Sequence, residues 1–269
     1  MERFDQDFAP PHDSDVDLDA FDPRPPDGIK KADCEAEIGE LRQRINDLQD
    51  LLYANRGFAV LIVLQGMDTS GKDGTIKSVF RDVGPLGTTV HPFGVPSEEE
   101  LAHDFLWRYH RRTPARGQLA IFNRSHYESV LVERVKAIVP RKVWKRRYDQ
   151  INDFEKMLAS EKTVILKFFL NISKDEQRKR LQARIDDPKK RWKFSAGDLD
   201  DRKLWGDYRQ AYADAIGRCH IPDSPWYVVP ADKKWYRDVV VARIVADRLG
   251  ALDLSYPPAS EALEGVVVV

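Results

Sequence analysis

A glycine-rich turn that follows the most apolar segment of the chain constrains its fold more than any other feature. Residues 58–64 form a continuous apolar run, as expected for a strand buried on both faces of a parallel sheet. The run leads into residues 66–73, Gly-Met-Asp-Thr-Ser-Gly-Lys-Asp, where a helical pattern begins. Two glycines and a lysine at this spacing are typical of a phosphate-binding loop. The alternative is a strand–helix turn that binds no ligand.

The residue types of this loop suit phosphate chemistry. Glycines allow backbone N–H groups to turn towards phosphate oxygens, and the following helix points its positive end at the anion. The lysine adds a mobile positive charge. We therefore predict phosphate contacts from Gly66, Thr69, Ser70, Gly71, Lys72 and Asp73.

Two carboxylates are unusual in an anion-binding loop. Asp68 lies within it, and Asp73 takes the position that usually holds Ser or Thr. A carboxylate would repel phosphate unless a cation lay between them. We expect Asp68 to hold Mg²⁺ that bridges the phosphates. Asp73 could do the same, could pair with a basic residue, or could stabilise the helix N-terminus.

Strand and helix patterns alternate along the rest of the chain, which predicts a doubly wound α/β sheet. Further strand candidates lie at 88–91, 118–122, 163–170 and 226–229. Helical patterns lie at about 33–55, 72–83, 97–110, 125–136, 140–159, 173–185, 198–217 and 234–249. Asp33 is the predicted cap of the first of these helices. Its apolar stripe predicts packing on the body or on a partner subunit.

Acidic and basic residues are distributed unevenly along the chain. Residues 1–28 hold nine acidic and two basic residues, whereas the whole chain holds 44 and 43. We predict an acidic flexible arm over 1–30, one domain over 31–255 and a C-terminal tail over 256–269. The remaining basic body suits a polyanion, but it also fits an ordinary solvated surface.

Composition excludes several classes of protein. Cys34 and Cys219 lie far apart, so neither a disulfide framework nor a zinc site is indicated. The N-terminus lacks the pattern of a secretory signal, and no apolar run approaches the ~20 residues needed to span a bilayer. These observations predict a cytoplasmic protein without a membrane partner.

Polar residues follow the strand candidate at 118–122. Because ligands bind at the carboxyl ends of parallel strands, Asn123 and Arg124 should lie near the phosphate loop if the two strands are neighbours. Arg124 can bind phosphate in a bidentate way. Ser125 and Glu128 also have the spacing of a helix capping box, and both interpretations can hold together.

A cluster of positive charge occupies residues 178–193. Arg180 and Arg184 lie four apart on one helical face, and Lys193 follows in the segment Lys-Lys-Arg-Trp-Lys-Phe. We interpret residues 175–210 as a helical lid that closes on phosphates and excludes water. The alternative is a charged surface, which we favour for a second basic group at 141–147.

These motifs together resemble the second family of polyphosphate kinases. The resemblance rests on residues 66–74, residues 122–128 and the lid, and it covers about 30 to 250. It implies a thymidylate-kinase-like fold, a P-loop kinase-type three-layer α/β/α sandwich with a parallel sheet and a helical lid. It also implies Mg²⁺-dependent phosphoryl transfer between inorganic polyphosphate and AMP, ADP or ATP. Separately, the apolar stripe over 33–55 suggests a partner surface, and we expect a homo-oligomer.

The resemblance also assigns roles to individual residues. Lys72 and Arg124 would stabilise the transferring phosphoryl group, Asp68 would bind the metal, and the lid arginines would hold phosphates. Many members carry Asp at the position of Asn123, and the Asn form followed by Glu128 resembles the subgroup that phosphorylates both AMP and ADP. This departure shifts metal binding towards Asp68 and makes Glu128 a candidate nucleotide-binding residue.

Two other functions remain open at this stage. An ATP-dependent nucleoside monophosphate kinase would use the same sandwich and lid. A nucleic-acid-binding P-loop protein would use the basic surface. The sequence lacks an aromatic-interleaved base-stacking motif, so we expect no nucleic-acid partner.

Overall fold

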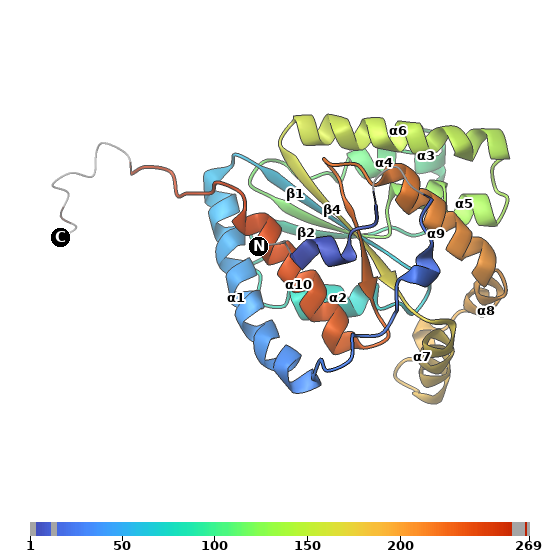
Figure 1. The fold of residues 1–269 in the computed structure, drawn as a ribbon. Coiled ribbons are helices and arrows are strands. Elements are labelled where there is room, and N and C mark those ends of the chain that lie inside the picture. The colour runs from blue at the N-terminus through green and yellow to red at the C-terminus, as the bar shows by residue number, and fades with distance from the viewer. Residues whose placement is uncertain (1–3, 12–14, 260–266, 268–269) are drawn as a thin grey trace.

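A single parallel sheet forms the centre of the molecule. The computed structural model describes residues 4–11, 15–259 and 267, and Figure 1 shows its fold. The sheet has the order β2-β3-β1-β4-β5, with every neighbouring pair parallel. Its strands are β1 (Ala59–Gln65), β2 (Thr88–Pro92), β3 (Leu119–Asn123), β4 (Thr163–Asn171) and β5 (Trp226–Pro230). The predicted α/β class and the strand candidates are confirmed.

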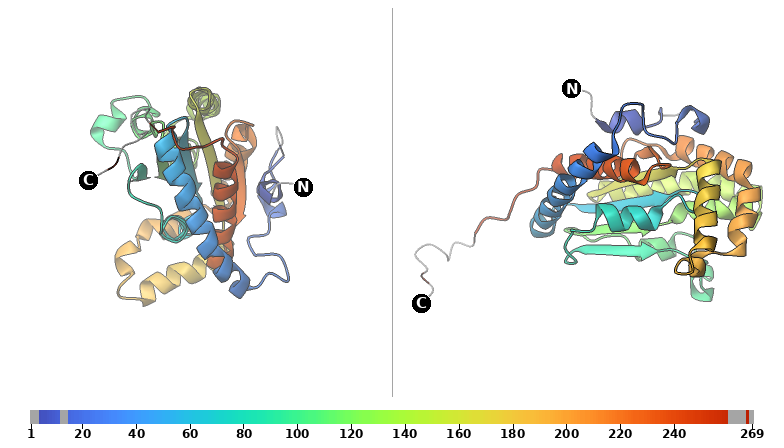
Figure 2. Two further views of the ribbon diagram at one scale, coloured as in Figure 1. Left: turned by 90° about the vertical axis from the view of Figure 1, so that its left-hand side faces the viewer. Right: turned by 90° about the horizontal axis from the view of Figure 1, so that it is seen from below.

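Helices cover both faces of this sheet. The α-helices are α1 (Lys31–Asn55), α2 (Lys72–Val79), α3 (Glu98–Leu101), α4 (Trp107–His110), α5 (Val132–Val135), α6 (Arg141–Ser160), α7 (Lys174–Asp186), α8 (Ala196–Lys203), α9 (Trp205–Cys219) and α10 (Lys234–Gly250). The 3₁₀ helices are η1 (Phe4–Phe8), η2 (Leu18–Ala20), η3 (His126–Ser129) and η4 (Arg191–Lys193). Helix α6 packs on the sheet opposite α10, and α1 runs beside α10 (Figure 2).

The core follows from the apolar runs of the sequence. All seven residues of β1 are buried, as a central strand covered on both faces requires. The apolar stripe of α1 buries Leu41, Ile45 and Leu52, and this helix packs on α10. Of the two predicted roles for the stripe, packing on the body is the one observed.

Three predicted helices are broken into shorter ones. The pattern over 97–110 is interrupted because Oδ1 of Asp104 accepts hydrogen bonds from the N–H groups of Leu106 and Trp107, which starts a new turn at α4. The pattern over 125–136 forms η3 and α5, and that over 198–217 divides at Leu204 into α8 and α9. Asp33 is not a cap, since Lys30 holds that position of α1.

The described part of the acidic arm packs on the body instead of extending from it. Phe8 and Leu18 are buried in the core. The carbonyl oxygen of Phe21 accepts a hydrogen bond from Nδ2 of Asn171 at 2.7 Å. Composition alone misses these anchors because a few apolar side chains among many acids suffice to hold the segment. The predicted tail over 256–269 lies mostly outside the described residues.

Candidate active site

The glycine-rich loop joins β1 to α2 at the carboxyl edge of the sheet. Gly66 and Gly71 have φ angles of 150° and 110°, a region in which side chains are strained. A Cβ atom on Gly71 would lie 1.8 Å from Nη1 of Arg237, and one on Gly66 would lie 2.9 Å from the carbonyl oxygen of Leu170. Glycine is therefore needed at both positions for steric reasons as well.

Lys72 is the first residue of α2 and folds back over the loop. Its Nζ atom donates to the carbonyl oxygens of Gly66, at 2.7 Å, and Met67, at 3.4 Å. Burial, together with the positive charge of Arg124, lowers the pKa of Lys72 to about 8. The ammonium is desolvated and held by neutral groups, so its attraction for a phosphate anion is stronger than it would be in water.

The end of β3 lies beside this loop, because Leu64 of β1 pairs with Asn123 in the parallel register. Nδ2 of Asn123 donates to Oδ1 of Asp73 at 2.8 Å, and Nζ of Lys193 lies 3.4 Å from Oδ2 of Asp73. Burial opposes ionisation of Asp73, but the Asn123 hydrogen bond and the Lys193 charge lower its pKa. Asp73 thus pairs with a basic residue, one of its three predicted roles.

Arg124 and Glu128 follow β3 and line a second pocket beside the loop, and Arg124 also lines the cavity that Asp73 lines. Nη2 of Arg124 is 3.3 Å from Oδ1 of Asp68. Arg124 has a φ of 65°, a strained value of the kind found at functional sites. Burial raises the pKa of Glu128, although Arg124 and Lys72 oppose that rise. The hydroxyl of Ser125 caps η3 by accepting from the N–H of Tyr127 and not from that of Glu128, so the predicted capping box does not form. Glu128 lines a pocket instead.

Two cavities meet at Asp68 and Arg124, which line both. The larger, which we call the basic cavity, has a volume of about 570 Å³ and is lined by three acidic and eight basic side chains. The basic ones are Lys72, Arg124, Arg180, Arg184, Lys190, Lys193, Lys234 and Arg237. The smaller, which we call the inner pocket, has a volume of about 60 Å³ and includes Glu128, Tyr208 and Tyr212.

The predicted lid forms one wall of the basic cavity. Arg184 of α7 approaches Asp198 of α8 at 3.3 Å. Lys193 connects the lid to the loop through Asp73. Arg180 also lines the cavity, but its N–H groups bond to Glu176 and to backbone carbonyls. Its geometry therefore differs from that of the phosphate ligand predicted from the sequence.

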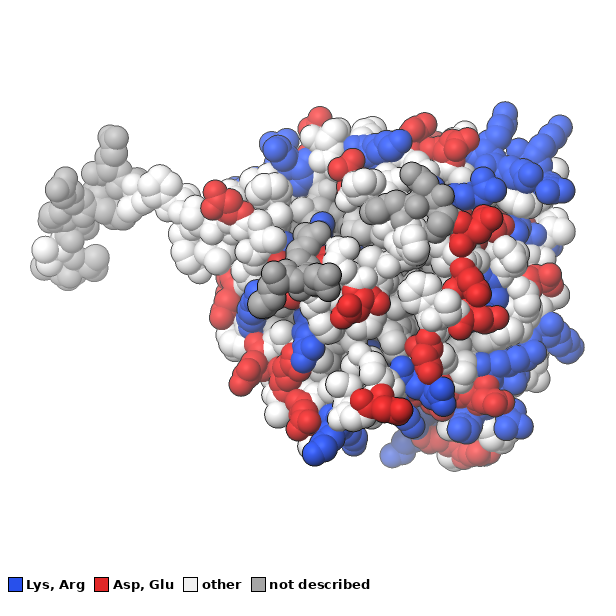
Figure 3. Space-filling model, viewed as in Figure 1, with Lys and Arg blue, Asp and Glu red and all other residues white. Residues whose placement is uncertain are grey.

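The second basic group lies elsewhere. Figure 3 shows acidic and basic side chains intermixed over much of one face, with Lys and Arg gathered at the upper right, over the N-terminal end of α6 in Figure 1. That end exposes Arg141, Lys142, Lys145 and Arg146. None of these four lines the basic cavity, which agrees with a charged surface.

Sequence reasoning missed the contribution of α10. Lys234 and Arg237 line the basic cavity, yet no motif surrounds them in the sequence. The usable signal was the position of Lys234 shortly after β5, because ligands bind beyond the carboxyl ends of parallel strands. Arg237 gave no such signal, since it is one of several charged residues along α10.

A parallel sheet, a loop of this geometry and an adjoining cavity rich in basic side chains are the features of a P-loop phosphotransferase. Within that class, the chain belongs to the polyphosphate kinase 2 family, whose model matches residues 28–255. The resemblance stated from the motifs is confirmed. Among the described residues, no helix is both long and apolar enough to cross a membrane.

Individual relatives support this assignment. The chain is 52% identical over 268 residues to the AMP/ADP-polyphosphate phosphotransferase of Meiothermus ruber, covering 100% of this chain and 95% of the relative. It is 46% identical to the ADP-polyphosphate phosphotransferase of Rhodopseudomonas palustris, covering 82% and 80%. The crystal structure of polyphosphate kinase 2 from Arthrobacter aurescens TC1 is 40% identical, with a TM-score of 0.92 and coverage of 98% and 95%.

Proposed function

We propose that this protein transfers phosphoryl groups from inorganic polyphosphate to AMP and ADP, producing ADP and ATP. The observation that carries the proposal is the basic cavity, where eight cations face three acids beside the phosphate loop. Such an excess of positive charge suits a donor that carries a negative charge on every phosphate. The names of the Meiothermus ruber and Rhodopseudomonas palustris relatives agree with these substrates.

Positioning and charge neutralisation suffice as the mechanism. The attacking oxygen belongs to a nucleotide phosphate and is already anionic, so no general base is required. Lys72 and Arg124, which both line the basic cavity, neutralise charge on the phosphoryl group in transfer. Asn123 fixes the carboxylate of Asp73 through their hydrogen bond. Glu128 in the inner pocket contacts the nucleotide, and lid residues Arg184 and Lys193 contact phosphates.

The residues of the site fit a magnesium ion whose coordination is completed by the phosphates of the substrate. Among the residues that the structure describes, no three His, Cys, Asp or Glu side chains gather around one point. Mg²⁺ is commonly held by one or two carboxylates with phosphates and waters. Asp68 suits this role because it lies where the two cavities meet. When bound, the ion would neutralise phosphate charge.

Asp68→Asn is expected to raise the Mg²⁺ concentration for half-maximal activity at least about tenfold, since an amide binds this hard cation more weakly than a carboxylate does. The matched control is Asp73→Asn, because both oxygens of Asp73 are already engaged by Asn123 and Lys193. Magnesium titrations of the two variants with polyphosphate and ADP make the comparison. A larger shift for Asp73→Asn than for Asp68→Asn would show that Asp73, and not Asp68, binds the metal.

Donor choice tests the proposed function itself. Purified protein supplied with AMP, polyphosphate and Mg²⁺, but no ATP, is expected to form ADP and then ATP. Parallel reactions with ADP, GMP and GDP measure the acceptor preference, and ATP with AMP and no polyphosphate serves as the competing donor. Activity only with ATP would show instead a nucleoside monophosphate kinase.

A further inference from the structure

All of the hydrogen bonds that the guanidinium of Arg180 can donate go to acceptors within the protein. A guanidinium has five N–H donors, and five acceptors surround this one at 2.7 to 3.0 Å. They are the carboxylate of Glu176 and the backbone carbonyls of Thr69, Ser70, Ala231 and Asp232. The side chain is only 10% exposed. No donor is left over for a phosphate in this arrangement.

Two of these acceptors belong to the phosphate-binding loop itself. Nη1 of Arg180 donates to the carbonyls of both Thr69 and Ser70 at 3.0 Å. In a planar trans peptide the carbonyl and the next N–H point in opposite directions. Because Arg180 fixes the direction of the Ser70 carbonyl, it also fixes the direction of the Gly71 N–H, which points the opposite way. Thr69 has a φ of 65°, which is costly for a β-branched residue, so this contact also offsets backbone strain.

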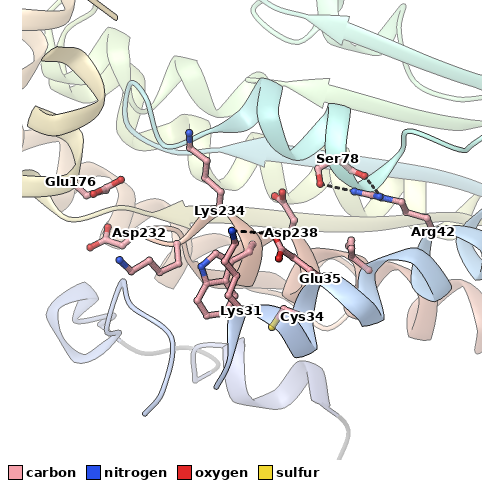
Figure 4. Close-up of a pocket in the computed structure, with 12 residues that line it drawn as sticks. Lys31, Cys34, Glu35, Arg42, Ser78, Glu176, Asp232, Lys234 and Asp238 are labelled. Atoms are coloured by element: carbon pink, nitrogen blue, oxygen red, sulfur yellow. Dashed lines mark hydrogen bonds and ion pairs between the residues drawn. The ribbon is translucent and has the colours of Figure 1, made fainter. Parts of the chain in front are cut away.

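A second arginine supports the same carbonyl from α10. Arg237 is 1% exposed, and its Nη1 lies 3.3 Å from the carbonyl oxygen of Ser70. Its Nε and Nη2 bond to Asp238 at 2.8 and 2.6 Å. The carboxylates that orient the two arginines, Glu176 and Asp238, both line a neighbouring cavity of about 540 Å³ (Figure 4).

The remaining contacts of Arg180 connect the loop to the lid. Arg180 and Glu176 both belong to α7, the first lid helix, whereas Ala231 and Asp232 lie between β5 and α10. One guanidinium thus joins the lid, the loop and the start of α10. Through these bonds, a displacement of the N-terminal part of α7 would also displace the carbonyl groups of Thr69 and Ser70.

We propose that Arg180 is a positioning residue, not a phosphate ligand: it holds the outer carbonyls of the phosphate-binding loop and couples the loop to the lid. Its kinetic consequence rests on the proposed function, but its effect on the free loop does not. Lysine cannot replace it, because an ammonium keeps the charge but offers three donors in place of a planar fork of five.

The variant Arg180→Lys separates positioning from charge. Amide hydrogen exchange of residues 67–71 in the ligand-free protein should accelerate at least about tenfold. With polyphosphate and ADP, kcat should fall at least about 30-fold while KM for polyphosphate changes less than about threefold. Arg184→Lys, one turn further along α7, is the matched control. It should leave exchange of the loop unchanged and raise KM for polyphosphate.

The opposite pattern would overturn the proposal. Unchanged exchange of the loop in Arg180→Lys, with a raised KM and an intact kcat, would make Arg180 a phosphate ligand. If Arg180→Lys fails to fold, Glu176→Gln replaces it, since this change removes the charge that orients Nε of Arg180. Unaltered exchange in a folded Glu176→Gln protein would count against the proposal. A wild-type protein inactive with polyphosphate would refute the proposed function, while the exchange comparison would still decide the role of Arg180.

Discussion

Lys72→Ala is expected to abolish phosphoryl transfer, lowering kcat/KM for polyphosphate at least about 10³-fold, while the fold survives. The large effect follows from the position of the ammonium, which is buried beside the loop and close to Arg124 and Asp68. A charge in such a water-poor site stabilises a developing anion much more than one in solvent. The fold survives because the bonds of Nζ are local, to the carbonyls of Gly66 and Met67.

A neighbouring lysine provides the control for this experiment. Lys77 lies on the same helix, is exposed and lines neither cavity. Lys77→Ala should therefore retain activity within about twofold of wild type, since exposed substitutions away from a site have small effects. Circular dichroism and thermal melting check that both variants are folded. More than a tenth of wild-type activity in a folded Lys72→Ala protein would contradict the role assigned to this residue.

Local patterns were enough to predict the centre of the site. The glycine spacing and the preceding apolar strand are enough to predict the loop at 66–73. The strand-end rule then brought Asn123 and Arg124 to the same place, as the pairing of β1 with β3 shows. These predictions succeed because parallel strands place their carboxyl ends at one edge of the sheet, where ligands bind, and because β1 and β3 are neighbours, which the sequence alone left open.

Side-chain partners could not be predicted in the same way. The spacing of the lid arginines indicates a shared helical face, but not whether their donors meet a ligand or a backbone carbonyl. Arg180 depends on Thr69 and Asp232, which lie far from it in sequence. Arg237 contacts the loop across the fold. Such contacts arise from how α7 and α10 pack, and a single sequence does not encode that packing in a local pattern.

Behind the site lies a buried polar cluster that the motifs did not reveal. Oε1 of Glu155 bonds to His126 and to the hydroxyl of Tyr127, each at 3.0 Å. Oε2 accepts from Nζ of Lys167 at 2.5 Å and from the hydroxyl of Ser224 at 2.6 Å. Burial disfavours the charged form of Glu155, but Lys167 and His126 outweigh it and lower its pKa to about 2. The cluster joins α6 and β4 to η3, the turn that carries Glu128.

Glu155→Leu is therefore expected to destabilise the protein by roughly 3–5 kcal/mol, because it leaves the Lys167 ammonium buried without its counter-ion. Urea unfolding measures the change, and a lower melting temperature should accompany it.

The double variant Glu155→Leu with Lys167→Met is the control, since removing both charges from an apolar site often restores stability. It should recover at least about half of the loss. A single variant within about 1 kcal/mol of wild type would show instead that the ammonium finds water or another partner. The double variant also separates two effects at the active site: lost activity in a stable double variant would mean that the cluster positions Glu128 through η3, beyond its contribution to folding.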